Sequence, residues 1–114
     1  MSLSIEVEQK RHVSVLGLNG RLTLGDPTDR LRSTVTQEMD LGHKNILLNM
    51  SRVDYIDSAG LGLLVGLHTH AIKQEGKLKL VALNGRVINL LQLTKLHTVF
   101  DIYDTESAAV LSFE

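Results

Sequence analysis

The sequence predicts a single small α/β domain whose mixed β-sheet has about five strands, accompanied by about four helices. The length of 114 residues suits one domain, so we expect residues 1–114 to fold together. Short apolar runs alternate with segments of helical periodicity, which predicts parallel strands joined by right-handed crossovers. Two strand-like segments follow each other at the start of the chain and predict an N-terminal antiparallel hairpin.

The predicted hairpin comprises residues 4–8 and residues 13–18. Residues 4–8 alternate polar and apolar side chains, as a half-buried edge strand does. Lys10-Arg11-His12 supplies a polar turn between the two strands. Asn19-Gly20 is a second turn signal, so we expect the second strand to end there.

The first helix is predicted to begin at Asp26-Pro27. Asp26 is the expected N-cap, and the proline takes the first helical position, where its missing N–H costs nothing. The apolar stripe of this helix consists of Leu31, Val35 and Met39. Gly42 is the expected stop, and the apolar residues 46–50 then predict a buried strand.

The second half of the chain continues the alternation of strands and helices. We expect a helix over residues 58–75, stopped by Gly76. A buried strand over residues 78–83 leads to a helix that Asn84 can cap. The last predicted elements are a short strand over residues 99–103 and a closing helix capped by Thr105.

The stretch over residues 53–66 is the most informative part of the chain, because a buried strand leads there through a loop into a helix. The residues at helical spacing are Leu61, Leu64, Val65, His68 and Ile72, so Ser58 lies where the helix begins. One interpretation of Ser58 is an N-cap, whose oxygen accepts from a free backbone N–H. The other is a phosphorylation site, because a helix N-terminus favours negative charge. The two interpretations are compatible.

Small residues mark one face of this predicted helix. Ser58, Gly62 and Gly66 are four residues apart, and Thr69 and Lys73 continue their stripe. Glycine in a helix interior costs about 1 kcal/mol relative to alanine. Another backbone can approach such a face closely, and it belongs either to the same domain or to a partner. The spacing leaves both interpretations open.

Residues 57–62, Asp-Ser-Ala-Gly-Leu-Gly, resemble the phosphorylation motif of STAS domains of the anti-sigma factor antagonist family. The resemblance extends from the first strand to Phe113 and includes the upstream segment Leu18-Asn19-Gly20-Arg21-Leu22. It implies a bacterial switch protein that binds an anti-sigma factor with serine kinase activity. Phosphorylation of Ser58 would release that partner, and a serine phosphatase would reverse the modification.

The resemblance also implies a docking surface around Ser58. The candidate partner-binding residues are Arg21, Thr23, Asp57, Ala59, Gly60, Gly62, Gly66 and Thr69. Asp57 either supports the helix dipole or helps to present Ser58 to a kinase. Many family members carry an acidic residue where this chain has Thr23, and Asp26 is the nearby acid.

Other functions find little support in the sequence. The third glycine of a dinucleotide fingerprint would fall at Val65, and a nucleophile elbow would need glycine at Ile56. The histidines lack the spacing of a helical zinc site, so we expect no metal, no cofactor and no enzyme. A formal net charge of −1 provides no electrostatic footprint for nucleic acid. The lack of cysteines, of a signal-peptide pattern and of a membrane-length apolar run fits a cytoplasmic protein.

Two alternatives to the phosphorylation switch remain open. STAS-like domains also occur as scaffold subunits or as adaptors on transport machinery, where docking is constitutive. A nucleotide-binding or hydrolysing domain is the other alternative, although the chain lacks a phosphate-binding loop.

Overall fold

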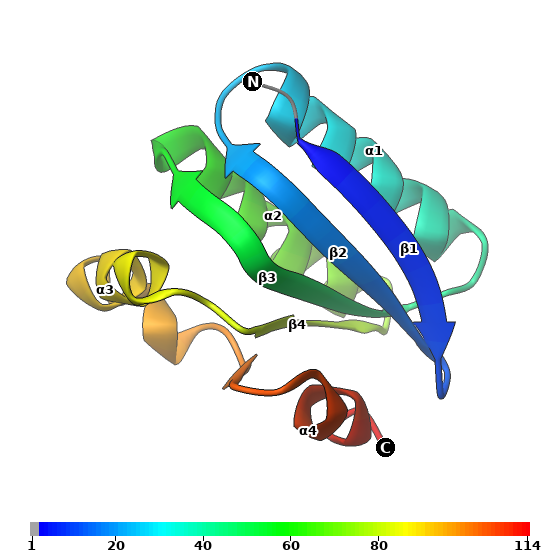
Figure 1. Cartoon of the computed structure of the whole chain (residues 1–114). Coiled ribbons are helices and arrows are strands. Elements are labelled where there is room, and N and C mark those ends of the chain that lie inside the picture. The colour runs from blue at the N-terminus through cyan, green and yellow to red at the C-terminus, as the bar shows by residue number, and fades with distance from the viewer. Residues whose placement is uncertain (1–2) are drawn as a thin grey trace.

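A computed structural model describes residues 3–114 and shows one five-stranded mixed sheet (Figure 1). In chain order, which is also the spatial order, the strands are β1 (Ser4–Lys10), β2 (Val13–Leu22), β3 (Asn45–Ile56), β4 (Lys77–Val81) and β5 (Ile102–Tyr103). β1 and β2 pair antiparallel, and every later pair is parallel. The predicted fold class and its N-terminal hairpin are therefore confirmed.

The helices cover the two faces of the sheet unequally. They are α1 (Asp26–Asp40), α2 (Ser58–Lys73), α3 (Gly85–Leu93), a 3₁₀ turn η1 (Leu96–Thr98) and α4 (Glu106–Leu111). α1 and α2 pack against one face and enclose the larger core, which includes Leu16, Leu48 and Leu64 (Figure 1). The short α4 covers part of the other face, where Ala109 and Val110 pack on strand residues.

β2 is longer than the sequence predicts. Asn19 and Gly20 do not end the strand, because Asn19 still pairs with both neighbouring strands and Gly20 lies beside a register shift. Gly20 has a φ of 130°, so its conformational freedom serves an irregularity inside the strand rather than a turn. The hairpin turn lies at Arg11-His12, within the predicted polar turn, and both residues have positive φ.

β3 also extends beyond its predicted end at residue 50. The prediction of a loop after residue 50 is wrong, because the strand continues to Ile56 beside the lengthened β2. Arg21 pairs with Tyr55, and Leu22 pairs with Ile56. Only Asp57 therefore separates the end of β3 from the start of α2.

Several helix ends differ from the predicted ones. Gly25 with a φ of 104° is the N-cap of α1, so Asp26 is the first helical residue and not the cap. Glu75 takes the left-handed conformation after α2, which ends at Lys73. A side chain on Gly76 would lie 2.2 Å from the carbonyl oxygen of Lys44, so packing explains that glycine.

The remaining boundaries need smaller corrections. Asn84 and Thr105 cap α3 and α4 through their side chains, as predicted. β4 ends before Ala82, whose φ is 62°, and β5 is much shorter than the predicted strand over residues 99–103. His68 is half-buried, and its ring lies 5.4 Å from that of Phe100.

Candidate functional site

The start of α2 is capped by Asp57 and not by Ser58. The backbone N–H of Gly60 donates to Oδ1 of Asp57 over 2.8 Å. Aspartate and serine are comparable N-caps, and Asp57 takes the cap position here. The Ser58 N-cap prediction is therefore wrong, and Ser58 is the first residue within the helix. Its exposed hydroxyl makes no hydrogen bond to residues 3–114.

Asp57 also ties α2 to the loop between β2 and α1. The backbone N–H of Leu24 donates to Oδ2 of Asp57 over 3.0 Å. This bond and the one from Gly60 hold the pKa of the Asp57 carboxyl below its usual value. One carboxylate thus caps α2 and binds the loop of residues 23–25, which we call the Leu24 loop. The interpretation that Asp57 supports the helix therefore has a direct structural basis.

The small-residue stripe of α2 faces solvent. Ser58, Gly62, Gly66 and Thr69 are all exposed, and we call these four residues the Ser58 face. A Cβ atom added at Gly62 or Gly66 would meet nothing within 4 Å. No element in the described part of the chain packs on this face, which excludes close packing within the domain as the reason for the glycines.

Gly60 and Ala59 differ from the Ser58 face. Gly60 is buried, and a Cβ atom there would lie 2.2 Å from the carbonyl oxygen of Leu22. Glycine at this position lets α2 approach the end of β2. Ala59 is half-buried. The structure thus brings Ala59 and Gly60 next to Ser58 but does not place Gly60 on the exposed surface.

The end of β2 lies beside the start of α2. Arg21 is exposed, and its guanidinium carbon lies 4.8 Å from the centre of the Tyr55 ring, at cation–π distance. Thr23 is half-buried, and its carbonyl oxygen accepts from the N–H of Thr28. Leu22 and Leu24, on either side of Thr23, both form hydrogen bonds with Asp57, so the two predicted docking residues lie beside the start of α2.

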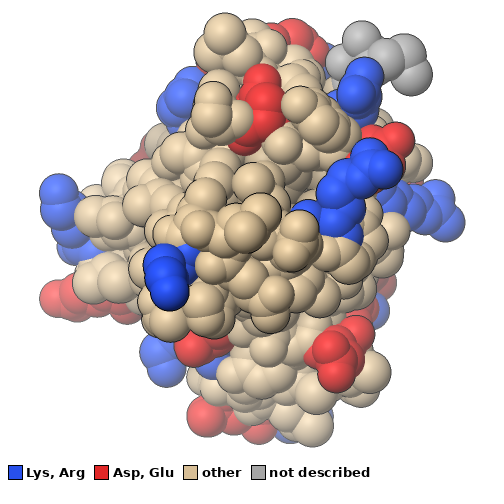
Figure 2. Space-filling model, turned by 90° about the vertical axis from the view of Figure 1, so that its left-hand side faces the viewer, with Lys and Arg blue, Asp and Glu red and all other residues tan. Residues whose placement is uncertain are grey.

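Sequence reasoning missed three apolar residues at this end of the sheet. Leu24 is 78% exposed, Leu93 is 74% exposed and Tyr55 is 38% exposed. Leu24 lies outside every strand or helix pattern in the sequence, and its isolation was the only sign that its side chain is exposed. Figure 2 looks onto this end of the molecule and shows a broad uncharged area interrupted by single charged side chains.

Comparison with known families decides the relationship. The family model described as STAS domain matches residues 4–109. The chain belongs to the STAS domain family.

Relatives of known sequence or structure match this STAS domain over nearly all of both chains. It is 28% identical to the anti-sigma F factor antagonist of Paenibacillus polymyxa, over 100% of this chain and 97% of the relative. A crystal structure of a candidate anti-sigma factor antagonist from Thermotoga maritima matches with a TM-score of 0.88 at 29% identity, over 96% and 93% of the two chains. The phosphorylated form of the Bacillus protein SpoIIAA matches with a TM-score of 0.75 at 21% identity, over 97% and 100%, and shows the shared fold.

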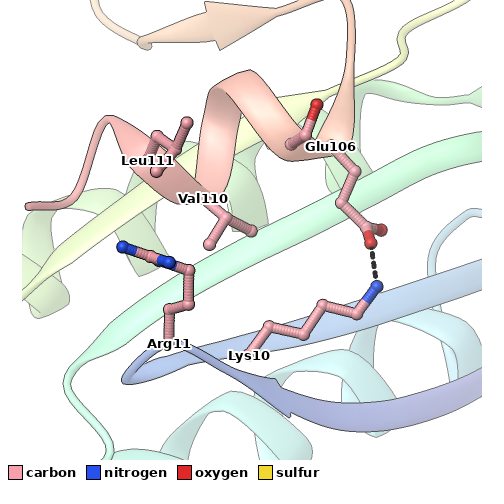
Figure 3. Close-up of a pocket in the computed structure, with 6 residues that line it drawn as sticks. Lys10, Arg11, Glu106, Val110 and Leu111 are labelled. Atoms are coloured by element: carbon pink, nitrogen blue, oxygen red, sulfur yellow. Dashed lines mark hydrogen bonds and ion pairs between the residues drawn. The ribbon is translucent and has the colours of Figure 1, made fainter.

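A hollow of the STAS domain lies between the hairpin turn and α4, at the end of the sheet opposite Ser58 (Figure 1). Lys10 forms an ion pair with Glu106, and Val110 and Leu111 line the hollow (Figure 3). Asn49 also donates to Glu106, and these bonds keep the pKa of the Glu106 carboxyl below its usual value. The polar groups of this hollow hold α4 on the sheet.

Residues 3–114 contain no cluster of three or more His, Cys, Asp or Glu side chains that could hold a metal ion. None of the helices in this range is long and apolar enough to cross a membrane.

Proposed function

We propose that this STAS domain is an anti-sigma factor antagonist controlled by phosphorylation of Ser58. Its unphosphorylated form binds an anti-sigma factor that is also a serine kinase, phosphorylation releases that partner, and a serine phosphatase restores the binding form. The protein is thus a substrate and a ligand in the cytoplasm, and not an enzyme. The observation that carries the proposal is the exposed, unbonded Ser58 hydroxyl at the start of α2.

The position of Ser58 suits a group that gains and loses phosphate. A phosphoryl group adds about −1.5 to −2 charges at neutral pH. The N-terminus of α2 stabilises such negative charge by up to about 2 kcal/mol. Because Asp57 carries the cap, modification of Ser58 leaves the cap hydrogen bond in place. The domain can therefore keep its fold in both states.

The proposed docking surface joins the Ser58 face to Arg21, Thr23 and Asp57. Gly62 and Gly66 leave room for a partner's backbone to approach α2. Ala59 is half-buried next to Ser58, and Gly60 is buried where α2 approaches Leu22. A phosphate buried at such an interface loses its water, and misplaced like charge there costs several kcal/mol. The Bacillus protein SpoIIAA, which shares this fold, has been solved in a phosphorylated form. That precedent supports a modification cycle on the same scaffold.

The test is capture of interacting proteins from native cells with tagged wild-type protein and with the Ser58→Ala and Ser58→Asp variants. We expect an anti-sigma factor kinase with the wild-type and alanine proteins, less of it with the aspartate protein, and phosphate on Ser58 by mass spectrometry. A large stoichiometric assembly captured equally by all three, with Ser58 never modified, would instead establish a constitutive scaffold or adaptor.

A further inference from the structure

We propose that a groove between the end of β3 and α3 forms a second part of the docking surface. Its occupant is a segment of the anti-sigma factor that presents an apolar side chain flanked by carboxylates. This inference rests on the proposed function, because it concerns the same partner and adds the chemistry by which that partner is recognised.

The groove, which we call the α3 groove, is an open hollow of about 300 Å³ with mostly apolar walls. Tyr55 and Ile56 of β3 form one wall, and Val87, Leu90 and Leu93 of α3 form the other. Leu93 and Tyr55 leave 74% and 38% of their surface exposed. An apolar side chain placed between these walls would remove their exposed carbon atoms from water.

Two arginines stand at the α3 groove without a counter-charge. Arg21 stacks over Tyr55, and Arg86 lines the groove. Among residues 3–114, neither guanidinium has a carboxylate within 4 Å, whereas Arg30 and Arg32 pair with aspartates of their own helix. The net charge of the chain is −1, so two guanidinium groups without a carboxylate partner in the described chain are a feature of this groove and not of the whole surface. Guanidinium groups prefer carboxylates with matching geometry, which makes an acidic partner segment the complementary one.

The α3 groove is continuous with the surface around Ser58. Ile56 lines the groove, and Ser58 follows two residues later. Two residues of extended chain span at most about 7 Å, so a partner that covers Ser58 also reaches the groove. A phosphoryl group on Ser58 would repel the carboxylates of the partner and would compete with them for the two arginines. The acidic segment thus explains why added negative charge releases the partner.

The experiment uses the anti-sigma factor recovered with wild-type protein, purified, as the probe. The groove variants are Leu93→Ser and Arg86→Glu in the full chain. Leu41→Ser and Lys44→Glu are the matched controls, since Leu41 is 63% exposed at the far end of α1 and Lys44 is exposed before β3. Affinity is measured by calorimetry, and the association rate is measured at several salt concentrations.

We expect each groove variant to bind at least about tenfold more weakly and each control to bind within about twofold of wild type. Arg86→Glu should also flatten or reverse the fall of the association rate with salt. Groove variants that bind like wild type, while phosphorylation of Ser58 still releases the probe, would overturn the α3 groove and leave the proposed function standing. If Leu93→Ser weakens binding and Arg86→Glu does not, the groove holds an apolar side chain, but the proposal that the partner segment is acidic is wrong. If wild-type protein recovers no anti-sigma factor, the proposed function itself fails, and the groove proposal fails with it.

Discussion

Gly66→Ala tests the Ser58 face sharply, because one added methyl group affects folding and docking in opposite directions. Gly66 lies inside α2, and a Cβ atom there meets nothing within 4 Å. Alanine is favoured over glycine in a helix interior by about 1 kcal/mol. For a domain of 114 residues, this gain raises the melting temperature by about 4 °C. A docked partner would meet the same methyl group where it now meets open space.

Gly60→Ala is the matched control, because it makes the same chemical change in the same helix. Its Cβ atom would lie 2.2 Å from the carbonyl oxygen of Leu22 and 3.0 Å from side-chain atoms of Leu22 and Ile56. The clashing oxygen belongs to the backbone of a paired strand and cannot rotate away. Such overpacking costs about 1–3 kcal/mol, so the melting temperature should fall.

Thermal unfolding followed by circular dichroism gives the stability, and calorimetry with the captured anti-sigma factor gives the affinity. We expect Gly66→Ala to melt higher than wild type and to bind at least about tenfold more weakly. A lower melting temperature for Gly66→Ala would refute the inference that this face is open within the domain. A stabilised variant with wild-type affinity would refute the inference that the partner docks there.

Three further predictions concern the start of α2. Ser58→Ala should change stability by less than about 0.5 kcal/mol, since Ser58 is exposed and does not cap the helix; a larger loss in a denaturant titration would show a structural role. The pKa of Asp57 is lowered in the folded state, so its stabilisation is present above the unfolded pKa near 4 and is lost as the pH falls through the folded value. The stability difference between wild type and Asp57→Asn should therefore shrink on acidification, and a difference independent of pH would contradict the hydrogen-bonding role of Asp57. Phosphorylation of Ser58 should shift backbone amide signals only near α2 and the Leu24 loop, whereas changes across the β1–β2 hairpin would contradict a local mechanism.

The fold class followed from the sequence because strand and helix periodicities are local signals that the packing reinforces. The boundaries did not follow, because they depend on neighbours. Asn19-Gly20 has the composition of a turn, yet pairing with β1 and β3 keeps it within a strand and absorbs the glycine in a register shift. Residues 51–56 look like a loop until the lengthened β2 provides a partner for them.

The candidate site was predictable in part for a similar reason. The spacing of Ser58, Gly62 and Gly66 indicated a common face, but only the packing shows that this face is open and that Gly60 is not part of it. Leu24, Tyr55 and Leu93 belong to three separate segments, and no local pattern connects them. The α3 groove exists only because β3 and α3 meet at one end of the sheet.

The shift of the cap by one residue, from Ser58 to Asp57, separates stability from signalling. A phosphoacceptor that also capped its helix would change the capping oxygen, and with it the stability of the domain, at every modification. Here the Asp57 carboxylate holds both the N–H of Gly60 and the N–H of Leu24, and Ser58 contributes to neither bond. If the proposed function is right, phosphorylation therefore changes the affinity for the partner and not the stability of the fold. About 1.4 kcal/mol of repulsion or lost hydration at the interface weakens partner binding tenfold. The two hydrogen bonds of Asp57, and the fold that they stabilise, stay the same.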